Sequence, residues 1–105
     1  MNTEFNIDIY KIVFRGSRSI IPSERYFQAS DPVEALKDFY FTFYRGRIHT
    51  KRLTITHIQI YNRFSNKWLD RMSEAVAGVD RNIKDSMSIK LDSEGKPNKI
   101  KLTKD

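Results

Sequence analysis

Basic side chains gather in the middle of this sequence with no acidic residue between them. Asp38 and Asp70 are separated by 31 residues that contain no carboxylate. The basic residues of this window are Arg45, Arg47, Lys51, Arg52, Arg63 and Lys67, and its histidines are His49 and His57. Arginine binds phosphate through two parallel hydrogen bonds, and counterion release from a polyanion adds affinity that needs no sequence code. The window therefore predicts a surface that contacts phosphates.

Aromatic residues accompany these cations and could provide rings on which bases stack. Tyr61, Phe64 and Trp68 lie around the predicted turn that carries Arg63 and Lys67. A competing interpretation makes Trp68 a half-buried residue of the fold. Residues 81–105 add seven basic and four acidic side chains. The candidate nucleic-acid-binding residues are Arg45, Arg47, His49, Lys51, Arg52, Tyr61, Arg63, Lys67, Trp68, Lys99 and Lys101.

Catalytic and metal-binding motifs were sought in the sequence, and none stands out. No glycine-rich phosphate loop, nucleophile elbow, kinase signature or zincin motif is present. His49 and His57 fall on different predicted elements, and no carboxylate lies near them in the sequence. The chain has no cysteine, which excludes disulfides and thiolate ligands. We expect a protein that is not an enzyme, with no catalytic residues, no metal and no cofactor.

Length and composition limit the class of protein. A chain of 105 residues that is 39% hydrophobic, with a net charge of +6, has room for one small basic domain. It contains no apolar run near the roughly 18 residues that span a bilayer, and its first residues do not resemble a signal peptide. The absence of cysteine favours a reducing compartment. These features predict a cytoplasmic protein with no membrane partner.

The first half of the chain predicts two strands and a helix. Residues 5–15 alternate as a strand whose apolar face changes, which indicates a bulge or a strand buried on both sides. Residues 24–29 read as its antiparallel partner. The helix 32–45 is expected to begin with Asp31 as its cap and Pro32 in its first position, and Glu34 could complete a capping box; Ser30 is an alternative cap. Gly46 is expected to end it, and Arg45 and Arg47 would complement the helix dipole.

The second half predicts a hairpin, a short helix and a ribbon. Residues 53–64 form a strand whose apolar phase slips at His57-Ile58, and a turn at Ser65-Asn66 leads into a return strand. A short helix over 70–77 would stop at Gly78, although a longer helical face that includes Trp68 and Met72 is an alternative. Ile89 and Leu91 would face Ile100 and Leu102 in a two-stranded ribbon. An isolated two-stranded ribbon has marginal stability in water, so part of this ribbon could become ordered only when it binds a partner.

The expected fold is therefore α+β. An antiparallel sheet of about four strands carries one main helix (32–45) on one face, and a short second helix and a basic C-terminal ribbon or tail follow. Residues 1–78 would form a single domain, and residues 79–105 a basic extension that is partly disordered.

Four segments between residues 9 and 62 match the pattern of a known family. They are IYKIVF at 9–14, the helix approach at 29–40, GRIHTKR at 46–52 and IQI at 58–60. In these segments the chain resembles the archaeal ribosomal protein LX family. The segment at 46–52 is similar to the basic Gly–His–Arg turn of that family. This resemblance implies a contact with ribosomal RNA through Arg47, His49, Lys51 and Arg52.

A second resemblance is carried by YKIVF at 10–14, by EAL at 34–36 and by a late strand. In these segments the chain resembles the small DNA-binding proteins of gokushovirus-type phages. We therefore expect a non-catalytic nucleic-acid-binding module that contacts RNA or DNA. The alternative is a phage or accessory protein–protein interaction module, acting as an inhibitor or assembly subunit, with Trp68 and Met72 exposed on its contact face.

Overall fold

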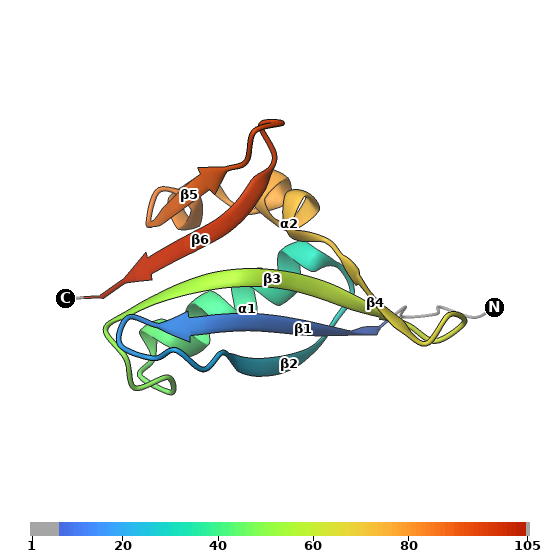
Figure 1. The fold of residues 1–105 in the computed structure, drawn as a ribbon, viewed down its shortest axis with the longest axis horizontal. Helices are drawn as coiled ribbons and strands as arrows, with labels where there is room; N and C mark the ends of the chain where they lie inside the picture. Colours follow the sequence, from blue (N-terminus) through green and yellow to red (C-terminus); the bar gives the residue numbers. More distant parts are fainter. Residues whose placement is uncertain (1–6, 105) are drawn as a thin grey trace.

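A computed structural model describes residues 7–104 (Figure 1). The elements in chain order are β1 (Asp8–Gly16), β2 (Ser23–Ala29), α1 (Pro32–Tyr44), β3 (Arg52–Asn62), β4 (Lys67–Asp70), α2 (Met72–Gly78), α3 (Arg81–Lys84), β5 (Met87–Leu91) and β6 (Pro97–Thr103). The six strands form one antiparallel sheet, in which β2, β1, β3, β6 and β5 are successive neighbours.

The long strand β3 organises this sheet because three strands pair with it. β1 follows one of its edges. The other edge is divided between β6, which pairs with residues 52–55, and β4, which pairs with residues 59–62. Between these two partners, the backbone N–H of Arg71 donates to the carbonyl of Ile58 at 2.7 Å, so the edge stays hydrogen-bonded where the chain leaves β4.

The architecture expected from the sequence is wrong in the number of strands and in the C-terminal part. The sheet has six strands, and three short helices accompany it, where about four strands, one main helix and a short second helix were expected. The predicted ribbon is part of the sheet, because β6 pairs with β3 and β5 pairs with β6. Ile100 and Leu102 are fully buried, and Val79 and Ile83 belong to the same hydrophobic cluster as Phe39. The ribbon therefore gains the apolar contacts that an isolated ribbon lacks.

The start of α1 confirms the predicted cap. The side chain of Asp31 accepts a hydrogen bond from the backbone N–H of Glu34 at 2.8 Å, and Pro32 occupies the first turn. The capping box differs from the expected one, because the Glu34 carboxylate accepts from the hydroxyl of Ser30 at 2.6 Å.

The end of α1 is fixed by glycine and by a distant lysine. Gly46 has a φ of 81°, which suits a residue without a side chain, and it ends the helix as predicted. The N–H groups of Gly46 and Arg47 donate to the carbonyls of Phe43 and Thr42, a Schellman motif. Arg45, the C-cap residue, and Arg47 lie at this end, where they were expected. Lys104 adds a cation that the sequence did not predict there: its Nζ donates to the carbonyls of Phe43 at 2.9 Å and Ile48 at 3.0 Å.

A bulge in β3 explains the predicted slip of its apolar phase. Val13 pairs with His57 and Phe14 pairs with Ile55, so Thr56 is an extra residue between them. Because of this insertion, Ile55 and Ile58 both face the core and both are fully buried.

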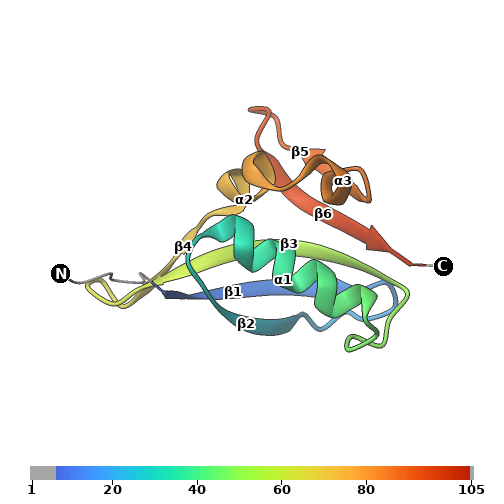
Figure 2. The same ribbon diagram turned by 180° about the vertical axis from the view of Figure 1, so that it is seen from behind.

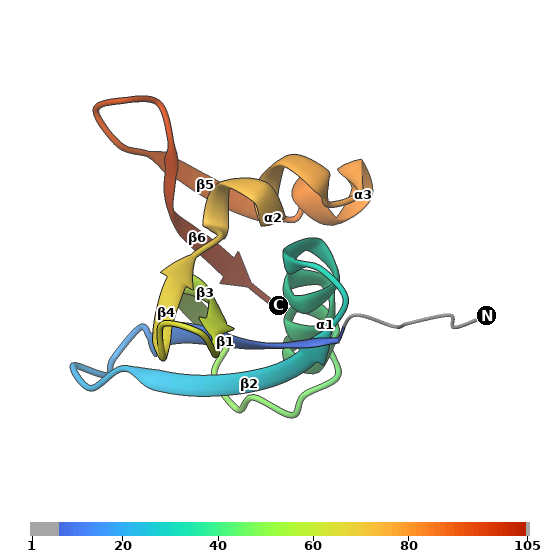
Figure 3. The same ribbon diagram turned by 90° about the vertical axis from the view of Figure 1, so that its right-hand side faces the viewer.

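All three helices cover the same face of the sheet and leave the other face open. Figure 2 shows α1 lying across β1 and β3, with α2 and α3 beside β5 and β6. The view along the strands in Figure 3 places the helices on one side. The covered face supplies the core residues Tyr10, Ile12, Phe14, Leu53, Ile55, Ile58, Ile100 and Leu102. We call the opposite, helix-free side of the sheet the outer face.

Gly78 lies where α2 meets α1, and we expect Gly78→Ala to destabilise the fold. A Cβ at this position would lie 2.4 Å from Cγ2 of Val33, a β-branched side chain that cannot easily rotate away. Such overpacking costs roughly 1–3 kcal/mol of unfolding free energy, which we expect to exceed the gain of up to about 1 kcal/mol from helix propensity. Urea denaturation measures the change.

The control for Gly78→Ala is the double variant with Val33→Ala, which removes the clashing methyl groups. The two substitutions should be less than additive, because the second one relieves the strain that the first introduces. A Gly78→Ala protein more stable than the original would contradict this account.

Candidate nucleic-acid interface

A basic concavity lies at one end of the sheet. Two adjoining hollows, of about 780 Å³ and 320 Å³, share Ser17 and Arg52. We call them together the basic basin; their lining residues are Gly16, Ser17, Arg18, Ser19, His49, Thr50, Lys51, Arg52, Leu53, Thr54, Lys101, Leu102 and Thr103. The basin therefore combines five potentially cationic side chains with several hydroxyl groups, and none of its lining residues is acidic.

Hydrogen bonds hold the loops of the basic basin together. The carbonyl of Arg52 accepts from the N–H of Ser17 at 3.2 Å and from the hydroxyl of Thr50 at 2.9 Å. The carbonyl of Lys51 accepts from the N–H of Lys104 at 2.9 Å. The β1–β2 turn, the α1–β3 loop and the end of β6 are thus tied through backbone groups. The side chains of Arg18, Lys51 and Arg52 remain exposed to solvent.

The positive charge of the basin continues onto the outer face. Arg15 of β1, Thr54 of β3 and Lys101 of β6 stand opposite one another across three neighbouring strands. The ion pairs found among residues 7–104 are Lys11–Glu24, Arg71–Glu74 and Lys96–Glu94. None of these pairs includes a basin residue or Arg15, so the field of these cations is not cancelled by a direct partner within the described chain.

Several predicted residues converge in this basin. The structure brings together His49, Lys51, Arg52 and Lys101, and Lys99 lies exposed two positions earlier on β6. Sequence reasoning missed Arg18. The available signal was its place in the turn-rich segment 16–19. Because β1 pairs antiparallel with β3, the turn that follows β1 lies beside the start of β3.

Arg45 and Arg47 belong to the α1–β3 loop but do not line the basin. The Arg45 guanidinium lies over the Phe41 ring, 5.4 Å from its centroid. Arg47 lines a hollow that adjoins the basin and shares His49 with it. This hollow also contains Arg25, whose guanidinium donates to the Arg47 carbonyl at 3.2 Å, and one carboxylate, that of Glu24.

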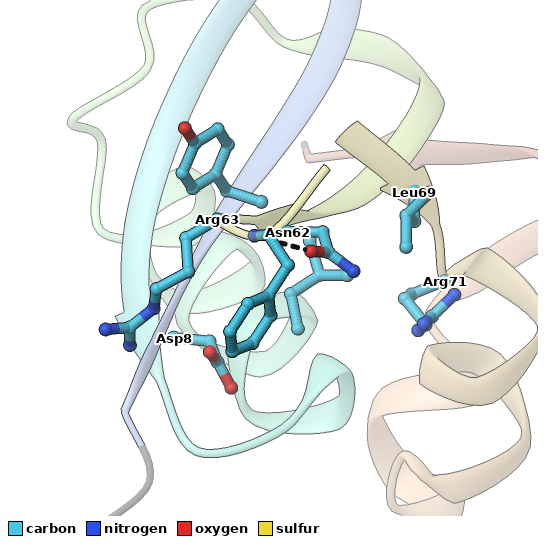
Figure 4. Close-up of a pocket in the computed structure, with 8 residues that line it drawn as sticks. Asp8, Asn62, Arg63, Leu69 and Arg71 are labelled. Atoms are coloured by element: carbon cyan, nitrogen blue, oxygen red, sulfur yellow. Dashed lines mark hydrogen bonds between the residues drawn. The ribbon is translucent and has the colours of Figure 1, made fainter. Parts of the chain in front are cut away.

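Arg63 and Lys67 lie at the opposite end of the sheet, in the turn region between β3 and β4. The 11 residues of β3 place this turn roughly 30 Å from the basin. There, Arg63 lines a smaller hollow of about 280 Å³ together with Arg71 and the acidic residue Asp8 (Figure 4). The six cations of the acid-free window are therefore divided between the two ends of β3 and do not form one cluster.

Three aromatic rings meet on the outer face near that second end. The Trp68 ring of β4 lies 5.2 Å from the Tyr61 ring of β3 and 5.9 Å from the Tyr26 ring of β2. Nζ of Lys11 lies 4.4 Å from the Trp68 centroid and 3.8 Å from Glu24. We call Tyr26, Tyr61 and Trp68 the aromatic cluster. Sequence reasoning named Tyr61 and Trp68 but not Tyr26, which lies on β2 and is separated from β4 by β1 and β3.

The most exposed ring of the cluster is held by a hydrogen bond to an acidic neighbour. The Tyr26 hydroxyl donates to the Glu24 carboxylate at 2.8 Å. This hydrogen bond is the main reason that the pKa of Tyr26 is raised above its ordinary value of 10.0, since ionisation would remove the donor and place a second negative charge beside Glu24. The bond helps to orient the ring.

Comparison with known proteins gives no relative from which a function could be transferred. No protein-family model matches the chain, and neither a curated protein nor a solved structure matches it significantly. The functional argument therefore depends on the geometry of the basin and the cluster.

Two further expectations from the sequence are wrong. The alternative helical face with Trp68 and Met72 is not formed, because Trp68 belongs to β4 opposite Tyr61. Met72 is 2% exposed and packs in the core, so it is not available for the protein contact that the rival hypothesis assigned to it.

Within residues 7–104, no group of three or more His, Cys, Asp or Glu side chains is arranged to hold a metal ion. Over the same residues, no helix combines the length and the apolar character needed to cross a membrane.

Proposed function

We propose that this protein is a non-catalytic nucleic-acid-binding module that contacts phosphates through the basic basin and the adjoining outer face. The observation that supports this most directly is the lining of the basin, where Arg18, His49, Lys51, Arg52 and Lys101 converge without a carboxylate. Basic side chains gathered on one part of a surface are the electrostatic footprint expected of such modules.

The chemistry of the basin suits phosphate oxygens. Arg18 and Arg52 offer planar guanidinium groups that can donate two parallel hydrogen bonds, and Lys51 and Lys101 add point charges. Hydroxyl groups also donate to phosphates in nucleic-acid complexes. The proposal includes no cofactor, and it places the protein in the cytoplasm, a reducing compartment consistent with the absence of cysteine.

A salt titration of oligonucleotide binding tests this proposal. Fluorescence anisotropy of a labelled 15-nucleotide DNA or RNA strand gives the affinity at 50 to 200 mM salt. If about four cations contact phosphates, the affinity for a single strand should fall roughly 50-fold over this range, because each contact contributes about 0.7 to the logarithmic slope.

Two outcomes would overturn the proposal. One is the absence of binding to single-stranded DNA, duplex DNA and RNA at 50 mM salt. The other is an affinity that does not change with salt. A companion experiment is a pull-down with this protein from a nuclease-treated extract. Recovery of one stoichiometric protein partner without nucleic acid would favour the hypothesis of a protein–protein interaction module.

A further inference from the structure

The basic basin and the aromatic cluster lie on one helix-free surface. Along β3, the outer face passes from Arg52 beside the basin, through Thr54, His57 and Gln59, to Tyr61 in the cluster. Arg52 and Tyr61 are separated by roughly 30 Å at the usual rise of a strand. A ligand on this face could therefore touch cations at one end and aromatic rings at the other.

We propose that the outer face holds a single, unpaired strand of nucleic acid, with phosphates in the basic basin and one or more bases against the aromatic cluster. This inference rests on the proposed function and adds the class of nucleic acid. Bases in a duplex are stacked on one another, so side-chain rings fixed on a sheet can reach a base face only where the strand is unpaired.

The cluster has the features of a base-binding platform. Tyr26 is 56% exposed, whereas Tyr61 and Trp68 are half-buried beside it. The rings are braced by Lys11 and by the Glu24 carboxylate, which accepts the Tyr26 hydroxyl hydrogen. An outermost ring supported in this way loses little freedom when a base stacks on it. Tyr26 is therefore the ring that we assign to the first base contact.

The length of the face sets a length requirement for the ligand. A stacked strand advances about 3.4 Å per nucleotide, so the distance from basin to cluster corresponds to at most about nine nucleotides, and to fewer if the strand is extended. This length falls within the site sizes of about 4 to 16 nucleotides known for single-strand-binding domains. A four-nucleotide strand should reach only one end, unless it is fully extended.

Trp68 gives a direct test because it is the only tryptophan of the chain. Binding of a nine-nucleotide DNA strand should change its fluorescence, whereas inorganic polyphosphate should bind the basin without that change. Affinity should rise steeply between four and nine nucleotides and then level off, and a duplex of the same length should bind more weakly. Equal affinity for duplex and single strand, or no change in Trp68 emission on binding, would overturn the inference.

Substitution of Tyr26 separates this inference from the proposed function. Tyr26→Ala should weaken single-strand binding by about 5- to 150-fold, the range known for loss of one stacking ring. Tyr26→Phe should retain most of the affinity, and Phe64→Ala, which removes a 96% exposed ring outside the cluster, should leave it unchanged. All three should still bind polyphosphate. If Tyr26→Ala binds single strands as tightly as the original chain, the base-stacking site is wrong, but the proposed phosphate binding is unaffected. If the original chain itself binds neither nucleic acid nor polyphosphate, the proposed function is wrong.

Discussion

Removing residues 79–105 is expected to abolish cooperative folding. The deletion takes the buried residues Val79, Ile83, Met87, Ile100 and Leu102 out of the hydrophobic cluster. Truncating a single large core side chain costs about 2–5 kcal/mol, whereas a whole domain is stable by only about 5–15 kcal/mol. The shortened chain would also expose the edge of β3 that β6 covers. Circular dichroism and urea denaturation should show no sigmoidal unfolding transition.

A pair of neighbouring substitutions gives the matched control for this deletion. Ile100 is fully buried, and Ile100→Ala should lower the unfolding free energy by about 2–5 kcal/mol. Lys101 is exposed on the outer face, and Lys101→Ala should change it by no more than about 0.5 kcal/mol. A chain ending at Gly78 that unfolds cooperatively, or equal effects of the two substitutions, would show that β6 is not integral to the fold.

The features of the fold that sequence predicts well are those determined by neighbouring residues. Asp31 and Pro32 specify the start of α1, and Gly46 specifies its end, because the groups involved lie within a few positions of one another. The slip at His57-Ile58 predicts the bulge for the same reason. The insertion of β6 between β3 and β5 has no such local signal. It depends on pairing Ile55 with Ile100, which lie 45 positions apart in the sequence.

In the candidate site too, sequence predicts the residues that are neighbours in the chain and misses those that only the fold brings together. The cations of residues 49–52 share a loop, so sequence could identify them together. Arg18 and Lys101 join them only because β1 and β6 pair with β3. The charge pattern also predicted too many cations on one surface. β3 is long enough to place Arg63 at the opposite end of the sheet, where it lines a hollow with Asp8. Tyr26 was missed because its contact with Trp68 spans two intervening strands.

Neutralising three cations of the basin is expected to weaken nucleic-acid binding more than neutralising three cations on the helix-covered side. In the triple variant Arg18→Gln, Lys51→Gln and Arg52→Gln, three exposed contacts are lost. Each contact to a single strand contributes about 0.7 to the logarithmic salt slope. The slope should therefore decrease by about 2 and the affinity at 0.1 M salt should fall by about 100-fold, as measured by anisotropy titrations at several salt concentrations.

The matched control removes three cations from the helix-covered side, through Lys37→Gln, Arg81→Gln and Lys84→Gln. These residues belong to α1 and α3 and do not line the basin. Both triple variants reduce the net charge from +6 to +3, so a purely nonspecific attraction would weaken equally in the two. A large loss of affinity and of salt slope in the basin variant alone would locate the phosphate contacts in the basin. Equal losses in both variants would mean that the overall charge, and not the convergence of Arg18, Lys51 and Arg52, attracts the polyanion.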